Sequence, residues 1–166
     1  MTYTVTFFRL PETLDELKLL KEGKLLQPED TAALCVAALC VYPNNKEESF
    51  KMLDYLRGPR PLSTMDKQFI ADRFMDGKDY IPRSYFSGST PENNYTPTAP
   101  YTVTLSDSHA PLSDPDNYRI LDVKSGGADS ARTITMRLKP STGEWFLWEQ
   151  TLLAGIREPK EKDVWA

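Results

Sequence analysis

The sequence predicts an α+β fold, with a helical N-terminal half packed on an antiparallel β-sheet (a meander) from the C-terminal half. Residues 32–42, AALCVAALCVY, carry no charged side chain, and a helix that is apolar on every face must be covered on every side. Helix signals fill the chain to about residue 79, and strand patterns separated by short turns follow. We expect one α+β domain over residues 1–156 and a charged tail over residues 157–166.

The N-terminal half opens with an alternating strand, in which Tyr3, Val5 and Phe7 share one side. Capping residues or a proline then begin each helix, and Gly or Pro ends it. The expected helices cover residues 13–23, 28–42, 45–58 and 63–77. On the last of these helices, the apolar residues expected to face the core are Met65, Phe69, Ile70 and Phe74.

The C-terminal half predicts strands over residues 80–86, 101–105, 118–124, 132–139 and 144–152. Pro82 places the first of them at an edge or a bulge. The last three read as an antiparallel meander, and the PSTG sequence at residues 140–143 suits a hairpin loop. In the final strand, Trp145 and Trp148 fall on opposite faces, which favours a central strand covered on both sides.

Composition limits the partners. The net charge of -4 argues against nucleic acid, and the sequence has no run of Lys and Arg with interleaved aromatic residues. The apolar central helix has far fewer than the roughly 20 residues of a membrane span, and the N-terminus does not resemble a signal peptide. We expect a cytoplasmic protein that binds an unknown protein or a polar small molecule, with no nucleic acid and no membrane partner.

The sequence offers little for metal or nucleophilic chemistry. Cys35 and Cys40 lie on one predicted helix, where their Cα atoms would be roughly 8 to 9 Å apart, beyond the roughly 7 Å limit of a disulfide. We expect two buried, reduced thiols. The single histidine, His109, falls in a predicted exposed turn. No metal site, no cofactor and no catalytic residue is predicted.

An acidic group provides the enzymatic alternative. Asp72 and Asp76 would share a face of the fourth helix at i, i+4, with Asp79 close behind. Such a carboxylate pair could serve as acid and base or hold a divalent ion in a small enzyme. Surface charge, with salt bridges to Arg73 and Arg83, is the simpler interpretation.

The most suggestive stretch is the loop at residues 87–100, SGSTPENNYTPTAP. Loops longer than about 12 residues are uncommon in compact domains and are often binding loops. The predicted binding residues, which offer amides, phenols and one guanidinium, are Arg83, Tyr85, Asn93, Asn94 and Tyr95. As a recognition surface, this loop should leave Tyr95 partly exposed. The prolines also suit a rigid structural crossover, which is the favoured interpretation of the loop because length alone is only suggestive.

Several runs resemble a family of uncharacterised bacterial proteins, which occur as short stand-alone chains in anaerobic Gram-positive gut bacteria. The matching runs are YLRGPRPLS, DKQFIADRFMDGKDYIPRSYF, STPENNYTPTAPYTV, SGGADS and KPSTGEWFLWEQTLLAGIR. The resemblance implies a bacterial cytoplasmic protein and carries over no activity, cofactor or catalytic residue. Sequence alone therefore favours a non-enzymatic binding or interaction module, with the Asp72 and Asp76 enzyme as the alternative.

Overall fold

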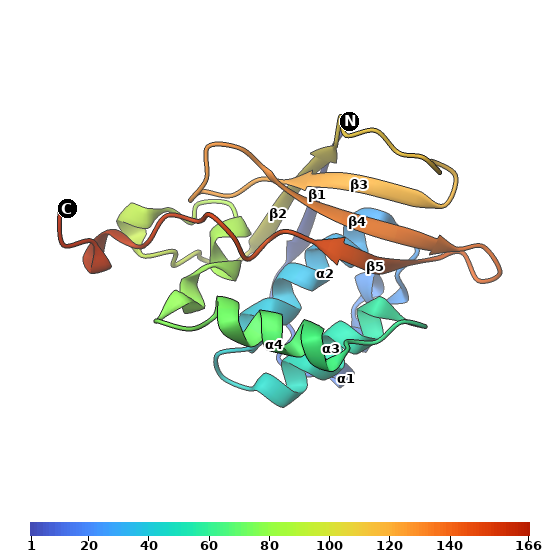
Figure 1. The fold of residues 1–166 in the computed structure, drawn as a ribbon, viewed down its shortest axis with the longest axis horizontal. Helices are drawn as coiled ribbons and strands as arrows, with labels where there is room; N and C mark the ends of the chain where they lie inside the picture. The colour runs from blue at the N-terminus through green and yellow to red at the C-terminus, as the bar shows by residue number, and fades with distance from the viewer.

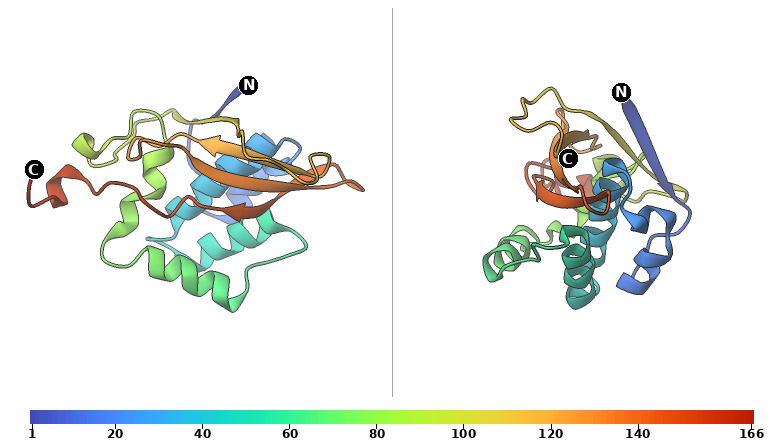
Figure 2. Two further views of the ribbon diagram at one scale, coloured as in Figure 1. Left: turned by 45° about the horizontal axis from the view of Figure 1, so that its top comes forward. Right: turned by 90° about the vertical axis from the view of Figure 1, so that its right-hand side faces the viewer.

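A computed structural model describes residues 1–166 and contains one five-stranded antiparallel sheet with helices on one face (Figures 1 and 2). The strands are β1 (Thr2–Phe7), β2 (Tyr101–Asp107), β3 (Tyr118–Val123), β4 (Arg132–Lys139) and β5 (Glu144–Gln150). The α-helices are α1 (Leu14–Leu19), α2 (Pro28–Val41), α3 (Lys46–Arg57) and α4 (Thr64–Arg73). Strand order follows chain order, β1-β2-β3-β4-β5, so the predicted α+β fold with its meander is confirmed.

Helix α2 forms the centre of the molecule, as its composition predicts. Every residue from Thr31 to Leu39 is buried, and the helix contacts β1, β3, β4 and β5 on one side and α3 on another. Pro28 occupies the first turn, and Glu29 and Asp30 follow it, where negative charge favours a helix N-terminus. No helix in the structure has both the length and the apolar character needed to cross a bilayer.

Helix α4 differs from the prediction. It ends at Arg73, and only Ile70 and Phe74 of its apolar residues are buried, whereas Met65 is 83% and Phe69 48% exposed. Ile70 and Phe74 form one i, i+4 stripe and Met65 with Phe69 forms another, about 100° around the helix. Because α4 lies at the margin of the helical layer (Figure 2, right), it buries only the first stripe.

The predicted strand over residues 80–86 is also wrong. The segment instead forms two 3₁₀ helices, η2 (Lys78–Tyr80) and η3 (Pro82–Tyr85). Pro82 supplies the first position of η3, which suits a residue with no N–H to donate. Only Phe86 reaches the sheet, through an isolated bridge to Val103.

Strand β5 lies at the edge of the sheet rather than at its centre, which corrects the prediction drawn from its two apolar faces. Its inner face is covered as expected, with Leu147 buried. Its outer aromatic residues, Phe146 and Trp148, are half-buried. The connection between α3 and α4 covers them. That connection creates the site described below.

The remaining structural expectations are mostly confirmed. His109 is exposed, and both cysteines are free. Cys35 is buried but Cys40 is only half-buried, because it lies near the end of α2, where the helix approaches a surface groove. Burial raises the pKa of each thiol to about 12, so neither is a thiolate at neutral pH.

Candidate functional site

The polar groups of the predicted binding loop at residues 87–100 form hydrogen bonds that hold the loop in place. Thr90 and Asn93 cap each other across the short helix η4 (Pro91–Asn93), and Asn93 Nδ2 donates to the Gly88 carbonyl at 2.7 Å. Arg83 Nε donates to the Tyr95 carbonyl at 2.8 Å, and Asn94 Oδ1 accepts from the Glu161 amide at 3.4 Å. Arg83 contacts only carbonyl oxygens in this loop, so its guanidinium acts as a brace.

Tyr95 is fully buried, so the expectation that a recognition loop would expose this ring is not met. The ring stacks on Tyr80 at a centroid distance of 5.4 Å, and its hydroxyl donates to the Arg157 carbonyl at 2.6 Å. Burial raises the pKa of Tyr95 to about 12. Tyr85 is buried too, and its hydroxyl donates to the Leu152 carbonyl. Both tyrosine side chains are therefore part of the core and are not available to a partner.

The charged tail beyond residue 156 packs against this loop. Arg157 donates its amide to Gly127 at 2.9 Å, Pro159 is buried, and Lys162 Nζ donates to the Gly77 carbonyl at 2.6 Å. Its short helix η5 (Lys160–Lys162) contacts η4, as Figure 1 shows at the end of the molecule opposite the β4–β5 hairpin. Only the last residues project, and Trp165 is 92% exposed.

The acidic candidates do not form the expected pair. Helix α4 ends before Asp76, whose backbone is left-handed with φ 61°, so Asp72 and Asp76 do not share a helix face. Asp72 instead accepts a hydrogen bond from Gln68 at 2.8 Å. Asp79 lies in η2, and none of the three has a cation within salt-bridge distance. No three His, Cys, Asp or Glu side chains converge anywhere in the molecule to hold a metal ion.

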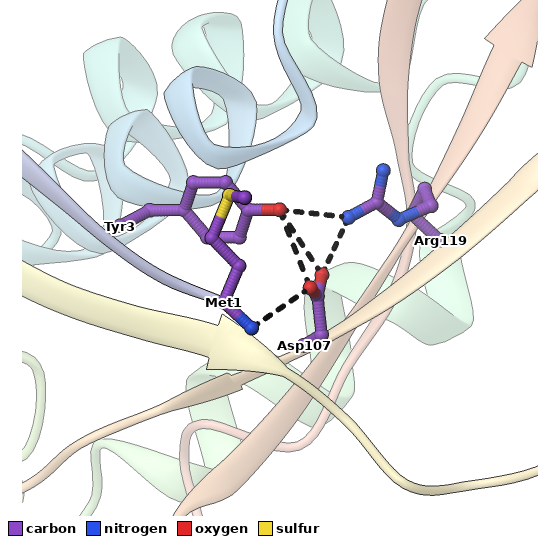
Figure 3. Close-up of polar contacts among 4 residues, drawn as sticks. All are labelled: Met1, Tyr3, Asp107 and Arg119. Atoms are coloured by element: carbon purple, nitrogen blue, oxygen red, sulfur yellow. Dashed lines mark hydrogen bonds and ion pairs between the residues drawn. The ribbon is translucent and has the colours of Figure 1, made fainter.

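One charged network, at the end of β1, β2 and β3, is structural (Figure 3). Asp107 accepts from Arg119, from the Tyr3 hydroxyl at 3.3 Å and from the Met1 amino group at 3.3 Å. Although burial opposes ionisation, the hydrogen bonds from Arg119 and the amino group keep the pKa of Asp107 below its usual value. Every charged group in the network has a partner, so it ties three strands together and leaves no charge for a ligand.

The strongest candidate site is a cleft along the edge strand, which we call the β5 cleft. It consists of two adjoining cavities of about 410 and 320 Å³, and Arg57, Arg60, Leu147 and Trp148 line both. Arg137 and Lys139 of β4 complete the larger cavity, which no acidic residue lines. These volumes fall in or near the range of ligand sites.

The sequence Gly58-Pro59-Arg60-Pro61 fixes one wall of the cleft. Gly58 closes α3 with φ 61°, and a Cβ on it would lie 2.5 Å from the Phe146 ring, so the loop backbone rests directly on β5. Arg57 Nε donates to the Arg60 carbonyl at 2.9 Å, and Asp54 accepts from the Leu62 amide at 2.8 Å. Two prolines further restrict the chain, so Arg60 is held in position before any ligand arrives.

Trp148 lies at the centre of the cleft because of a β-bulge. Thr135 pairs with Glu149 and Met136 with Leu147, which leaves Trp148 without a partner on β4. Bulges bend an edge strand and redirect a side chain, often beside functional sites. The Arg60 guanidinium stacks 3.8 Å from the Trp148 ring centroid and also donates to the Trp148 carbonyl, and the Arg137 guanidinium lies 5.0 Å from the same centroid.

The positive charges of the cleft are mostly uncompensated. Arg57 pairs with Asp66 at 3.6 Å, but no carboxylate lies within 4.0 Å of Arg60, Arg137 or Lys139. Burial and then the neighbouring Arg60 charge lower the pKa of Arg57. A hydrogen bond from the Ser63 amide is the main cause of the lowered pKa of Asp66, which therefore stays ionised. An added anion would relieve repulsion among the cations.

This arrangement suits the recognition of an anionic oxygen group. A guanidinium whose face rests on an aromatic ring still presents N–H groups at its edge, where they bind carboxylate or phosphate in pairs. Sequence reasoning missed the site because Arg57 and Arg60 lie about 80 to 90 residues before Arg137 and Trp148. The available signal was two arginines around a rigid glycine–proline turn, together with an aromatic strand that proved to be an edge.

Comparison with known proteins gives a family but no function. A family model described as Domain of unknown function (DUF6935) matches residues 9–160, a span that includes the whole β5 cleft. No curated protein and no solved structure matches the chain.

Proposed function

The chain belongs to the family Domain of unknown function (DUF6935), and from this premise we propose that it is a non-enzymatic binding module that recognises an anionic oxygen group in the β5 cleft. The single observation that carries the proposal is the set of cations, Arg60, Arg137 and Lys139, that line one cavity without a carboxylate partner. The group recognised is a carboxylate or a phosphate, because both match the planar fork of a guanidinium.

The charge of the whole chain supports a ligand with few charges. A protein of net charge -4 repels a long polyanion such as nucleic acid at most of its surface. A ligand with one to three charges can bind the local positive cleft without that cost. We therefore propose a protein or a polar small molecule as the partner, and no nucleic acid.

The side chains of the cleft favour binding over catalysis. Arginine keeps its proton at any physiological pH, and tryptophan offers only an N–H donor. The carboxylate that pairs with Arg57, Asp66, has a lowered pKa, which makes it a weak general base. We also propose a bacterial cytoplasmic location, which is consistent with two free thiols of raised pKa.

Calorimetric titration with citrate and with inorganic pyrophosphate tests the proposal and distinguishes carboxylate from phosphate. We expect saturable 1:1 binding that weakens as salt is added. Arg60→Ala and Arg137→Ala should each weaken binding at least tenfold, since a hydrogen bond to a charged group contributes about 1.5 to 3 kcal/mol.

Arg9→Ala is the matched control. It removes the same charge from a side chain that is 81% exposed and lies outside the cleft. If it weakens binding as much as Arg60→Ala, the effect is one of net charge and the site is wrong. Absence of saturable binding of both anions would refute the proposed function.

A further inference from the structure

The two cavities of the β5 cleft open on opposite faces of the sheet. Along β4 and β5, Met136 and Leu147 face the helices and are buried, whereas the adjacent pair Arg137 and Phe146 faces the other way. The larger cavity is therefore on the outer face. The smaller one is on the helix side, where α3 and α4 line it. The free edge of β5 runs between them.

The two cavities also differ in chemistry. The outer one has four cations and no acid. The helix-side one has apolar walls from five residues of the helical layer. Arg57 and Arg60 line it as well, and the Asp66 carboxylate already pairs with Arg57 there. Its apolar residues from this layer are Leu39, Leu53, Leu62, Phe69 and Ile70. A carboxylate is thus favoured on the outer side and disfavoured on the helix side, where an apolar group fits instead.

An exposed apolar stripe extends the helix-side cavity. Phe69 lines that cavity at 48% exposure, and Met65, one turn earlier on α4, is 83% exposed. Arg73, the next residue along the same stripe, stacks 4.8 Å from the Phe69 ring. A small anion in the outer cavity would leave this stripe uncovered, so the surface exceeds what a small ligand needs.

An extended peptide has the geometry that fits both sides at once. Its side chains alternate in direction, so a peptide lying along a sheet edge sends alternate residues to the two faces. The edge is closed at Trp145, whose amide donates to Leu25 at 2.7 Å and whose carbonyl accepts from Thr31 at 2.6 Å. Beyond it, the edge from Leu147 to Gln150 is roughly 13 Å of extended chain, where Arg60 bonds to the Trp148 carbonyl.

We propose that the partner of the β5 cleft is an extended protein segment with alternating acidic and apolar side chains, lying along β5 from Leu147 to Gln150. Its acidic side chains bind Arg60, Arg137 and Lys139, and its apolar side chains cover Phe69 and Met65. The bulge at Trp148 and the bond from Arg60 to the Trp148 carbonyl blunt the edge, so side-chain contacts provide the recognition. This inference rests on the proposed function.

Fluorescence anisotropy with two labelled octapeptides tests the inference. One alternates Glu and Leu, and the other has the same composition in two blocks, four Glu followed by four Leu. We expect the alternating peptide to bind at least tenfold more tightly, and more tightly than citrate. Met65→Ser should weaken the alternating peptide at least tenfold and leave citrate binding unchanged, because Met65 is 83% exposed and lines neither cavity.

Leu19→Ser is the control, since it removes an equally exposed apolar side chain (86% exposed) from α1, away from the cleft. Equal affinities for the two peptides, or no loss in the Met65→Ser variant, would overturn the inference while citrate binding upholds the proposed function. Failure of citrate, pyrophosphate and both peptides to bind would overturn both. If sedimentation shows a dimer that this variant converts to a monomer, a second copy covers the stripe and the inference is wrong.

Discussion

Replacing Gly58 with alanine should loosen the loop that positions Arg60. Gly58 has φ 61° and ψ -119°, a conformation that costs an L-residue of order 1 to 3 kcal/mol. The new Cβ would lie 2.5 Å from a carbon of the Phe146 ring, and relieving such a clash costs about 1 to 3 kcal/mol more. We therefore expect a loss of about 2 to 6 kcal/mol of unfolding free energy.

Urea unfolding of Gly58→Ala and Gly143→Ala measures the two contributions separately. Gly143 also has a positive φ, 76°, but nothing lies within 4 Å of its added Cβ, so its variant should lose only about 1 to 2 kcal/mol. Phe146→Leu in the Gly58→Ala background should recover part of the difference, as a double-mutant cycle would detect. Equal losses in the two glycine variants, with no recovery, would refute the contact between the loop and β5.

Four further predictions concern the core and its titrating groups. Tyr95→Ala should cost about 3 to 5 kcal/mol in urea unfolding and Tyr95→Phe only about 1 kcal/mol, and a loss under 1 kcal/mol for the alanine variant would mean that this ring is not buried. Leu39→Ala should cost about 2 to 5 kcal/mol if α2 is central, and a smaller shift of the unfolding midpoint would place α2 at the surface. Burial and then the nearby charges of Glu22 and Glu29 raise the pKa of Asp30 from 3.8 to about 6. The folded state therefore binds a proton that the unfolded state has lost, and the free energy of unfolding falls as pH rises from 4 to 6. Asp30→Asn should flatten that fall, and a pH profile unchanged by the substitution would contradict the raised pKa. Cys35 should resist brief iodoacetamide treatment of the native protein because its thiol is buried with a pKa of about 12, and rapid alkylation seen by mass spectrometry would contradict this burial.

The sequence was sufficient for those elements whose signal is local. The apolar run at residues 32–42 predicted the buried helix α2, period-two alternation predicted β1, and the short turns between the last three strands predicted the β3-β4-β5 meander. Local patterns failed where the same run of residues is compatible with two different structures. Phe69 looked like a core residue, but α4 has only one neighbour-facing stripe and leaves that ring at the surface. The aromatic residues before Phe86 suited a strand, but two 3₁₀ turns bury them equally well.

The candidate site depended on tertiary pairing that periodicity cannot provide. A strand with apolar residues on both faces need not be central, because the Gly58–Pro61 loop covers Phe146 and Arg60 covers Trp148. Conversely, a loop rich in amides and phenols need not bind anything. Tyr95 is buried against Tyr80, and Arg83 is committed to its carbonyl. The Tyr95 hydroxyl also bonds to the carbonyl of Arg157, 62 residues later, a partner that no local pattern indicates.

The most direct test of the β5 cleft is a heteronuclear NMR titration of the labelled protein with citrate, following the indole N–H signals of Trp145, Trp148 and Trp165 and the side-chain Nε–H signals of the arginines. Citrate in the cleft should shift Trp148, Arg60 and Arg137 along one saturable curve. The signal of Trp165, which is 92% exposed in the tail, should not move. Equal, non-saturating shifts at Trp148 and Trp165, or none at either, would contradict the conclusion that this cleft recognises anions.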